Sequence, residues 1–292
     1  MKQSIPYQSS PKLRGSGKRR AFTLIELMVV VTLISILSAI LLSALAKART
    51  RANAIFCLNN TRQLTQAWLL YAQDNNGRLV YNLSGSESRL ASPMGDSYLN
   101  WVNNVMTWGL DSDNTNSATI KRAGLSPYAG DSVAIFHCPA DNVLSPKQKS
   151  AGWSSRIRSY SMNAMVGDAG QLVQAGANIK NPGYRQFMAE SSLAAVEASD
   201  IFVFLDEHPD SINDGNFANN GSKLQWESLP ASYHNGAGSF SFADGHCVLH
   251  RWACQSTKRA ARPDGAGLPF SILTSELTDY NWVVKHMSVN HP

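Results

Sequence analysis

The sequence lacks the short motifs that mark the common types of enzyme site. It contains no Gly-x-Ser-x-Gly segment, no His-Glu-x-x-His segment, no phosphate-binding loop and no Cys-x-x-Cys pair. These patterns are typical of serine hydrolases, zinc peptidases, nucleotide-binding proteins and thiol redox or zinc sites, respectively. The absence of a motif does not by itself exclude catalysis, but no residue pattern in this chain supports it. We therefore expect a protein that is not an enzyme.

Acidic residues are missing from the first 21 positions, which carry six of the 26 lysines and arginines. Beyond this leader, 20 basic side chains are balanced by 21 acidic ones, so the formal charge changes from +5 for the whole chain to −1. The excess of positive charge is therefore confined to the leader and does not indicate a surface that follows a phosphate backbone. The sequence predicts no nucleic-acid partner.

Only one apolar run is long enough to cross a bilayer. It covers residues 27–46 without a charged side chain, and as a helix it would be about 30 Å long, the thickness of the hydrocarbon core. The basic residues before the run outnumber Lys47, Arg49 and Arg51 after it, which favours a cytoplasmic N-terminus. We expect a single-pass protein of the inner (cytoplasmic) membrane whose C-terminal part is periplasmic or otherwise extracytoplasmic.

A carboxylate stands at the start of this run, within the segment Phe-Thr-Leu-Ile-Glu-Leu at residues 22–27. Charged residues at a membrane span are costly and usually carry a task. Together with the basic leader, the segment resembles the N-terminus of type IV pilins and type II secretion pseudopilins. The resemblance implies that prepilin peptidase cuts between Ala21 and Phe22 and methylates the new amine. It also implies that Glu26 meets the N-terminal amine of a neighbouring subunit during assembly. Ala21 stands where the family usually has Gly.

Two other interpretations of the N-terminus compete with this one. Residues 44–46, Ala-Leu-Ala, resemble the cleavage site of an ordinary signal peptide, but the apolar run exceeds the usual 7–15 residues and Glu26 interrupts its entrance. Arg19 and Arg20 could begin a twin-arginine export signal, although the stretch that follows is unusually hydrophobic for one.

The apolar pattern continues as a helix beyond the membrane span. From Ala54 to Tyr71, apolar positions recur every three or four residues, and Asp-Asn-Asn-Gly at 74–77 provides a helix stop. Short β-prone pieces such as 133–137 and 201–205 then alternate with turn-forming clusters. We expect an α+β, pilin-like fold in which a long N-terminal helix packs on a loop-rich antiparallel β head. The expected domains are a basic leader at 1–21, a transmembrane and amphipathic helix at 22–76, and an exported head at 77–292.

An Asp-Gly pair at 244–245 predicts a hairpin with a two-residue turn. In that register Phe242 faces Cys247 and Phe240 faces Leu249 on a buried face. The opposite face would carry Ser239, Ser241, His246 and His250.

Nine residues separate His234 from the pair Asp244-Gly245. This spacing resembles the C-terminal motif of a group of pilin-like proteins from planctomycete and verrucomicrobial bacteria. That resemblance implies a pseudopilin architecture but assigns the motif no role. His234 and Asp244 could belong to an active or metal site. In the simpler alternative, Asp244 and Gly245 form the turn and His234 bonds a nearby backbone group.

Four carboxylates follow the apolar piece 201–205, and they could hold Ca²⁺, which takes six to eight oxygen ligands. Some secretion pseudopilins bind calcium in head loops, so the family resemblance also allows this cofactor. The alternative is a turn rich in residues that favour turns. The candidate ligands are Asp206, Glu207, Asp210 and Asp214.

All four cysteines lie in the part expected to be exported, where disulfides can form. A bridge between Cys57 and Cys138 is conceivable, as is one between Cys247 and Cys254. The sequence does not choose among the possible pairings, and buried free thiols are an equal alternative.

Together these features predict a structural pilin-like (pseudopilin) subunit of a type II secretion or type IV pilus-like filament. Its expected partners are the membrane, prepilin peptidase and other pilin or pseudopilin subunits. The competing class is an exported, membrane-anchored domain that binds carbohydrate or another ligand, or acts as an enzyme, and uses this N-terminus for delivery. Seven Trp and nine Tyr residues could stack on sugars, or they could fill a core.

Overall fold

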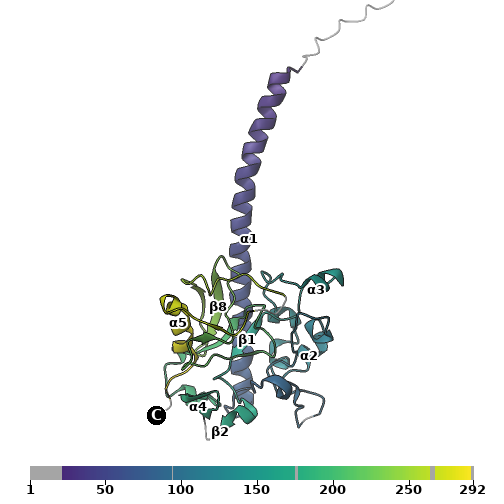
Figure 1. The fold of residues 1–292 in the computed structure, drawn as a ribbon. Coiled ribbons are helices and arrows are strands. Elements are labelled where there is room, and N and C mark those ends of the chain that lie inside the picture. Colours follow the sequence, from purple (N-terminus) through teal and green to yellow (C-terminus); the bar gives the residue numbers. More distant parts are fainter. Residues whose placement is uncertain (1–21, 94, 175–176, 264–266, 291–292) are drawn as a thin grey trace, which may run out of the picture. The chain divides into compact units, whose positions relative to one another are not determined.

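The computed structural model describes residues 22–93, 95–174, 177–263 and 267–290. The chain divides into two compact units, one ending at Lys47 and the other covering Ala48–Pro292. Helix α1, Leu24–Asp74, contributes to both units (Figure 1). It agrees with the expected helix within two residues at each end. The second unit begins inside α1, whereas the sequence analysis places the head after residue 76.

The first unit contains the apolar start of α1. Its described side chains are exposed on every face of the helix, as a lipid-facing segment requires. The hydroxyl groups of Thr32, Ser35 and Ser43 donate hydrogen bonds to carbonyl oxygens three or four residues earlier, so these polar groups are satisfied within the helix. Among the described residues, α1 is the one helix long and apolar enough to span a membrane.

The second unit is built on a five-stranded sheet with the order β6-β1-β5-β8-β9. All neighbouring strands are antiparallel except β1 and β6, which are parallel. The strands are β1 Tyr160–Asn163, β5 Phe202–Asp206, β6 Asn216–Phe217, β8 Ala237–Phe242 and β9 Cys247–Arg251. Two small sheets complete the β-structure: β2 Val173–Gln174 with β3 Ala177–Asn178 and β4 Asn181–Arg185, and β7 Gln225–Trp226 with β10 Phe270–Ser271.

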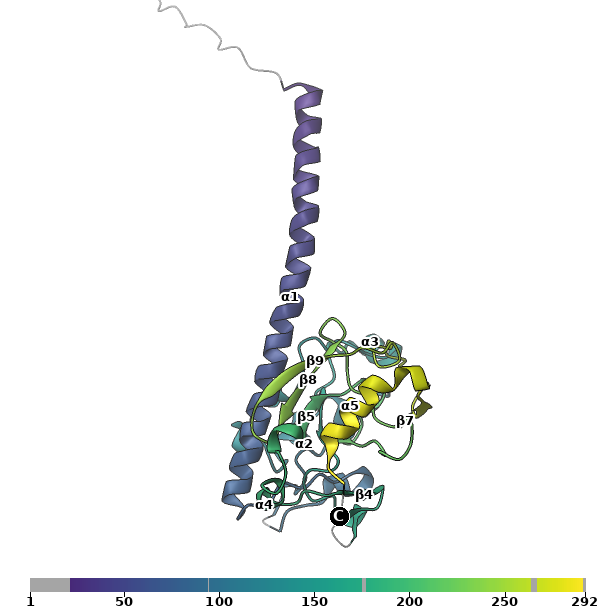
Figure 2. The same ribbon diagram turned by 90° about the vertical axis from the view of Figure 1, so that its left-hand side faces the viewer.

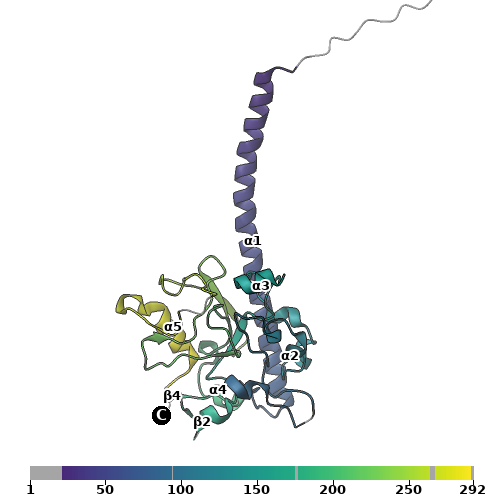
Figure 3. The ribbon, with the colours of Figure 1, turned by 45° about the vertical axis from the view of Figure 1, so that its right-hand side comes forward.

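Short helices surround the sheet, with α2 and α3 on one side of the head and α5 on the other (Figure 3). The α-helices after α1 are α2 Ser117–Lys121, α3 Pro146–Ser150, α4 Glu190–Leu193 and α5 Leu277–Met287. The 3₁₀ turns are Gly85–Arg89, Ser112–Asn114, Pro127–Ala129, Val133–Phe136, Gly170–Leu172, Ala198–Asp200 and Thr274–Glu276. The expected strand at 133–137 is therefore wrong, because a short apolar run does not distinguish a strand from a helical turn. The expected strand at 201–205 is present as β5.

The five-stranded sheet is covered on both faces, since β5, β8 and β9 lie between α1 and α5 (Figure 2). One core joins apolar residues of α1 to β1 and β5: Cys57, Leu64, Trp68, Tyr160, Met162, Val203 and Phe204. A second core joins β5 and β8 to α5: Phe202, Leu205, Phe240, Phe242, Tyr280, Val283 and Met287. One face of the second half of α1 is thus part of the core of the head.

The β8–β9 hairpin has a longer turn than the sequence predicts. Ser241 pairs with Cys247 and Phe240 with Val248. The N–H of Phe242 donates to the carbonyl of His246, which leaves three residues, 243–245, in the turn. Gly245 adopts a φ of +91°, as expected when a glycine completes a three-residue hairpin loop.

The extra turn residue changes the partners of every side chain in β9. The rings of His246 and His250 contact Phe242 and Phe240, so both histidines lie on the phenylalanine face. Ser239 and Ser241 are fully buried, because α1 covers the face that was expected to be open.

Leu64 provides a test of the packing between α1 and the sheet. Leu64 is fully buried, whereas Leu70 on the same helix is 48% exposed. Leu64→Ala should lower the free energy of unfolding by about 2–5 kcal/mol, because the substitution leaves a cavity between helix and sheet. Denaturant unfolding of the full chain in detergent, followed by near-UV circular dichroism, measures the change. Leu70→Ala is the matched control and should change stability by less than about 1 kcal/mol; equal losses would contradict this packing.

Candidate functional site

The N-terminal site begins at Phe22, which is 74% exposed; Ala21 lies outside the described residues. Thr23 and Glu26 form a reciprocal cap at the start of α1. The N–H and hydroxyl of Thr23 both donate to Glu26 Oε2 at 2.8 Å, and the N–H of Glu26 donates to Thr23 Oγ1 at 3.2 Å. This is the capping-box arrangement, which satisfies backbone donors that a helix start leaves free.

The cap gives Glu26 a local partner within its own chain. The pattern Thr-x-x-Glu is visible in the sequence, so this contact could have been predicted from the capping-box signature. Glu26 therefore has a structural contact in addition to the assembly role that the family resemblance implies.

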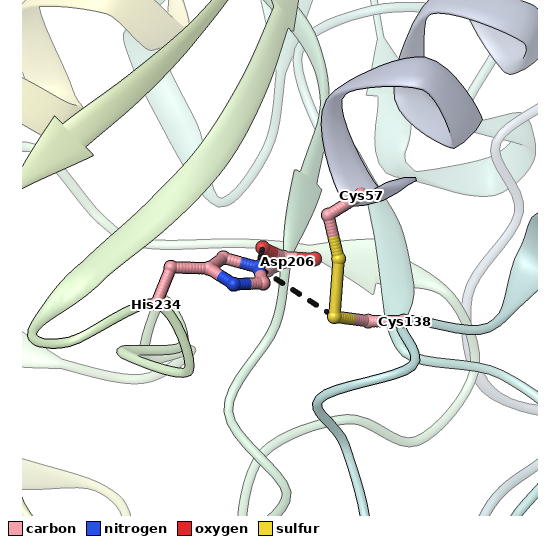
Figure 4. Close-up of side chains that lie close together, drawn as sticks. All are labelled: Cys57, Cys138, Asp206 and His234. Carbon is pink, nitrogen blue, oxygen red and sulfur yellow. Dashed lines mark hydrogen bonds and ion pairs between the residues drawn. A yellow bond between two sulfur atoms is a disulfide. The ribbon is translucent and has the colours of Figure 1, made fainter. Parts of the chain in front are cut away.

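A second candidate site lies inside the head, where a disulfide joins Cys57 of α1 to Cys138 (Figure 4). The two cysteines are 81 residues apart in the sequence and both are fully buried. The hydroxyl of Tyr160 donates to Cys57 Sγ at 3.2 Å. Cys247 and Cys254 are free thiols in the structure, so the alternative bridge between them is not formed.

His234 reaches this disulfide from the loop before β8. Its Nε2 lies 3.6 Å from Cys138 Sγ and 3.2 Å from Asp206 Oδ2. Asp206 Oδ2 also accepts the backbone N–H of Ser239 at 2.9 Å. The other polar atoms of the pair, Asp206 Oδ1 and His234 Nδ1, are buried without a hydrogen-bond partner. Because one ring nitrogen faces both partners, the geometry differs from a catalytic triad, in which the two imidazole nitrogens serve separate groups.

The spacing of His234, Asp244 and Gly245 follows from the hairpin. His234 precedes β8, and Asp244-Gly245 follows it in the turn. Asp244 Oδ1 accepts the N–H of His246 at 3.0 Å and contacts His246 Nδ1 at 2.6 Å. The three motif residues therefore lie at opposite ends of one strand and form no common site. The sequence could not pair His234 with Asp206 and Cys138, because these contacts connect loops far apart in the chain.

The four candidate calcium ligands have different partners. Asp210 accepts the N–H of Arg262, and Asp214 accepts the N–H groups of Gly85 and Asn216. Both carboxylate oxygens of Glu207 are buried without a hydrogen-bond partner. Of the four, only Asp206 belongs to a described group of at least three His, Cys, Asp or Glu side chains with ligand atoms within 4.8 Å of one another. Calcium binding by these residues stays a prediction.

The buried carboxyl group of Glu207 lies near the buried guanidinium group of Arg158. Burial raises the pKa of Glu207 to about 7, although the nearby Ser161 and Ser211 side chains and the charge of Arg158 oppose the shift. Arg158 is itself fully buried, and its guanidinium donates to neutral acceptors on Asn104, Tyr160, Ser161 and Asn213. The head therefore stabilises a protonated Glu207 in weakly acidic conditions.

Glu207→Gln should remove a specific part of the pH dependence of stability. The folded-state pKa of about 7 lies above the ordinary value of 4.5, so between these pH values the folded chain holds a proton that the unfolded chain releases. This contribution to stability is complete below pH 4.5 and is lost as the pH rises through 7, a change of about 3 kcal/mol. Urea unfolding of wild type and Glu207→Gln from pH 4.5 to 8 isolates it by difference. The exposed Glu197 gives the control Glu197→Gln, and a wild-type slope retained in Glu207→Gln would contradict the assignment.

Comparison with known proteins bears on the N-terminal site. Residues 16–42 match the family described as the prokaryotic N-terminal methylation motif, and this match includes Phe22, Thr23 and Glu26. No curated protein and no solved structure matches the chain. The chain therefore carries a prokaryotic N-terminal methylation motif, a type IV pilin-like signal, at the start of a helix long and apolar enough to span a membrane.

Proposed function

We propose that the protein is a pilin-like (pseudopilin) subunit that prepilin peptidase processes and that assembles into a type II secretion or type IV pilus-like filament. The observation that carries the proposal is the methylation motif at residues 16–42, which includes most of the apolar part of α1. The peptidase would remove the basic leader after Ala21. The new amine on Phe22 would then be available to Glu26 of a neighbouring subunit.

The proposal places the protein in the inner membrane with its N-terminus in the cytoplasm. It is supported by the six basic residues before the apolar run, because positive charge is retained on the cytoplasmic side. The head would then fold outside the cytoplasm, where the disulfide between Cys57 and Cys138 is chemically stable. That bridge fixes α1 to the head within the second unit, which suits a subunit whose helix must transmit its position to a folded domain.

In this proposal the head has a structural rather than a catalytic role. The polar cluster around the disulfide is closed to solvent: Asp206 is fully buried and His234 is only 5% exposed. A substrate could not reach these groups without opening the core. The alternative, a carbohydrate-binding domain, has less support because Trp68, Trp101, Trp226 and Trp252 are buried.

The processing step predicts that the mature chain begins at Phe22 with a methylated amine. Mass spectrometry of the N-terminal peptide from purified membranes measures both the start and the added mass. Ala21→Gly places the family's usual residue before the cut and should be processed at least as fully. A mature chain that begins at Lys47 would indicate an ordinary signal peptide, and an intact Met1 would exclude processing.

The assembly step predicts that Glu26 acts through its charge. Glu26→Gln keeps the group that completes a capping box but removes the charge, whereas Thr23→Ala removes the capping hydroxyl and keeps the carboxylate. Glu26→Gln should insert and be processed normally but fall at least tenfold in crosslinked subunit pairs, since an ion pair in a low-dielectric setting is lost.

Thr23→Ala is the matched control and should assemble close to the wild-type level. Quantitative pull-down of crosslinked subunits, with blotting of the processed form as the loading reference, measures each variant. Assembly of Glu26→Gln at the wild-type level would show that capping rather than charge is the task of Glu26.

A further inference from the structure

Four buried side chains lie close together in the head, and each could supply one ligand to a metal ion. They come from four different parts of the fold. Cys57 comes from α1, Cys138 from the segment after a 3₁₀ turn, Asp206 from the end of β5 and His234 from the loop before β8. Their ligand atoms all lie within 4.8 Å of one another. Two cysteines, a histidine and a carboxylate are a donor set suited to Zn²⁺, which binds sulfur, imidazole nitrogen and carboxylate oxygen tetrahedrally.

The distances around His234 fit a tetrahedral site. Zinc bonds of about 2.0–2.3 Å place neighbouring ligand atoms about 3.3–3.8 Å apart. His234 Nε2 lies 3.2 Å from Asp206 Oδ2 and 3.6 Å from Cys138 Sγ. These two separations are thus already close to the values that a tetrahedral site requires, and the remaining ligand atoms lie within 4.8 Å of one another. The sulfur atoms of Cys57 and Cys138 are bonded to each other, so a metal could enter only in the thiol form of the chain.

The hydrogen bonding of the cluster is also compatible with a bound cation. Asp206 is fully buried, and its Oδ1 has no hydrogen-bond partner. A buried carboxylate is costly unless it is paired or coordinates a metal. Oδ2 of this carboxylate pairs with His234 Nε2 and accepts the N–H of Ser239, whereas Oδ1 is free to bind a cation. Tyr160 donates its hydroxyl to Cys57 Sγ, which is the kind of outer contact that orients a metal-bound thiolate.

We propose that the thiol form of this chain binds one Zn²⁺ through Cys57, Cys138, Asp206 and His234. Binding releases the two thiol protons to solvent, while His234 binds as neutral imidazole through Nε2 and Asp206 as carboxylate. The newly made chain has both thiols, so this state needs no reductant. Exchange with another disulfide, of a protein or a small molecule, oxidises the two cysteines: their sulfur atoms become bonded to each other, the other disulfide takes up two electrons and two protons to become two thiols, and Zn²⁺ is released. Zinc and disulfide are therefore alternative cross-links between the same segment of α1 and the same loop of the head.

The test uses the full chain in detergent, either oxidised or unfolded in denaturant, reduced with a water-soluble phosphine and refolded, because the folded core closes the disulfide to solvent. The phosphine takes up one oxygen atom from water as the disulfide becomes two thiols. Both samples are incubated with zinc chloride, and excess ion is removed. Elemental mass spectrometry of the zinc content should then give one Zn²⁺ per reduced chain and none per oxidised chain. Co²⁺ in place of zinc should give visible bands of tetrahedral geometry together with a thiolate-to-metal charge-transfer band.

His234→Ala and Asp206→Asn should each weaken zinc binding by more than about tenfold, because even the loss of an outer partner of a ligand costs 10–100-fold. The exposed pair His246 and Asp244 provides matched controls, since its two side chains contact each other at 2.6 Å in the turn. His246→Ala and Asp244→Asn should bind zinc as the wild type does, as should Cys247→Ser.

Three results would overturn the proposal. They are a reduced wild type without stoichiometric zinc, equal zinc in the oxidised chain, and unchanged zinc affinity in His234→Ala. Should His234→Ala or Asp206→Asn fail to fold, the cobalt spectrum of the reduced wild type decides alone: bands of an octahedral site without thiolate charge transfer would exclude these ligands. Because neither zinc nor cobalt binding depends on cleavage at Phe22, a negative result here is distinct from failure of the proposed assembly role.

Discussion

The head depends on the packing of one helix segment against one sheet. The second half of α1 supplies Cys57, Leu64 and Trp68 to the core that it shares with β1 and β5, and the disulfide at Cys57 ties the same segment to the loop at Cys138. Linking residues 81 positions apart restricts the unfolded chain, which stabilises the fold by roughly 4.5 kcal/mol in the chain-entropy description. Helix α5, near the C-terminus, covers the other face of the sheet and forms the second core with β5 and β8.

Much of this arrangement could be predicted from local patterns. The apolar run at 27–46, the three- and four-residue spacing that follows it and the Asp-Asn-Asn-Gly stop together predict α1 almost to its ends, and the apolar piece before Asp206 is a buried strand. The hairpin register could not be predicted, because an Asp-Gly pair fits a two-residue or a three-residue turn and only the covering layers decide between them. The burial of Ser239 and Ser241 could not be predicted from the local sequence either, because the helix that covers them lies more than 160 residues earlier in the chain.

The contacts around His234 show why spacing alone gives an incomplete account of a site. The nine residues between His234 and Asp244 correspond to the length of β8 with its flanking turns, so the regular interval follows from a strand rather than from chemistry. The partners that matter to His234, namely Asp206 and Cys138, lie 28 and 96 positions away. Nothing in the local sequence links them, whereas the Thr23–Glu26 cap is local and can be read directly from residues 23–26.

Hydrogen bonds between α1 and the head also fix the rotation of α1 about its own axis. Thr65 donates its hydroxyl to Ser241 Oγ at 2.6 Å, and Asn60 donates its side-chain amide to the carbonyl of His137 at 3.0 Å. Hydrogen bonds are directional, so these two contacts add to the core packing in resisting rotation of the helix about its axis. The rotation of this part of the helix relative to the sheet is therefore fixed. As a result, the exposed side chains of Ile55, Phe56 and Leu70 keep one orientation relative to the rest of the head. A molecule that binds this segment of α1 would therefore contact the same set of exposed side chains each time.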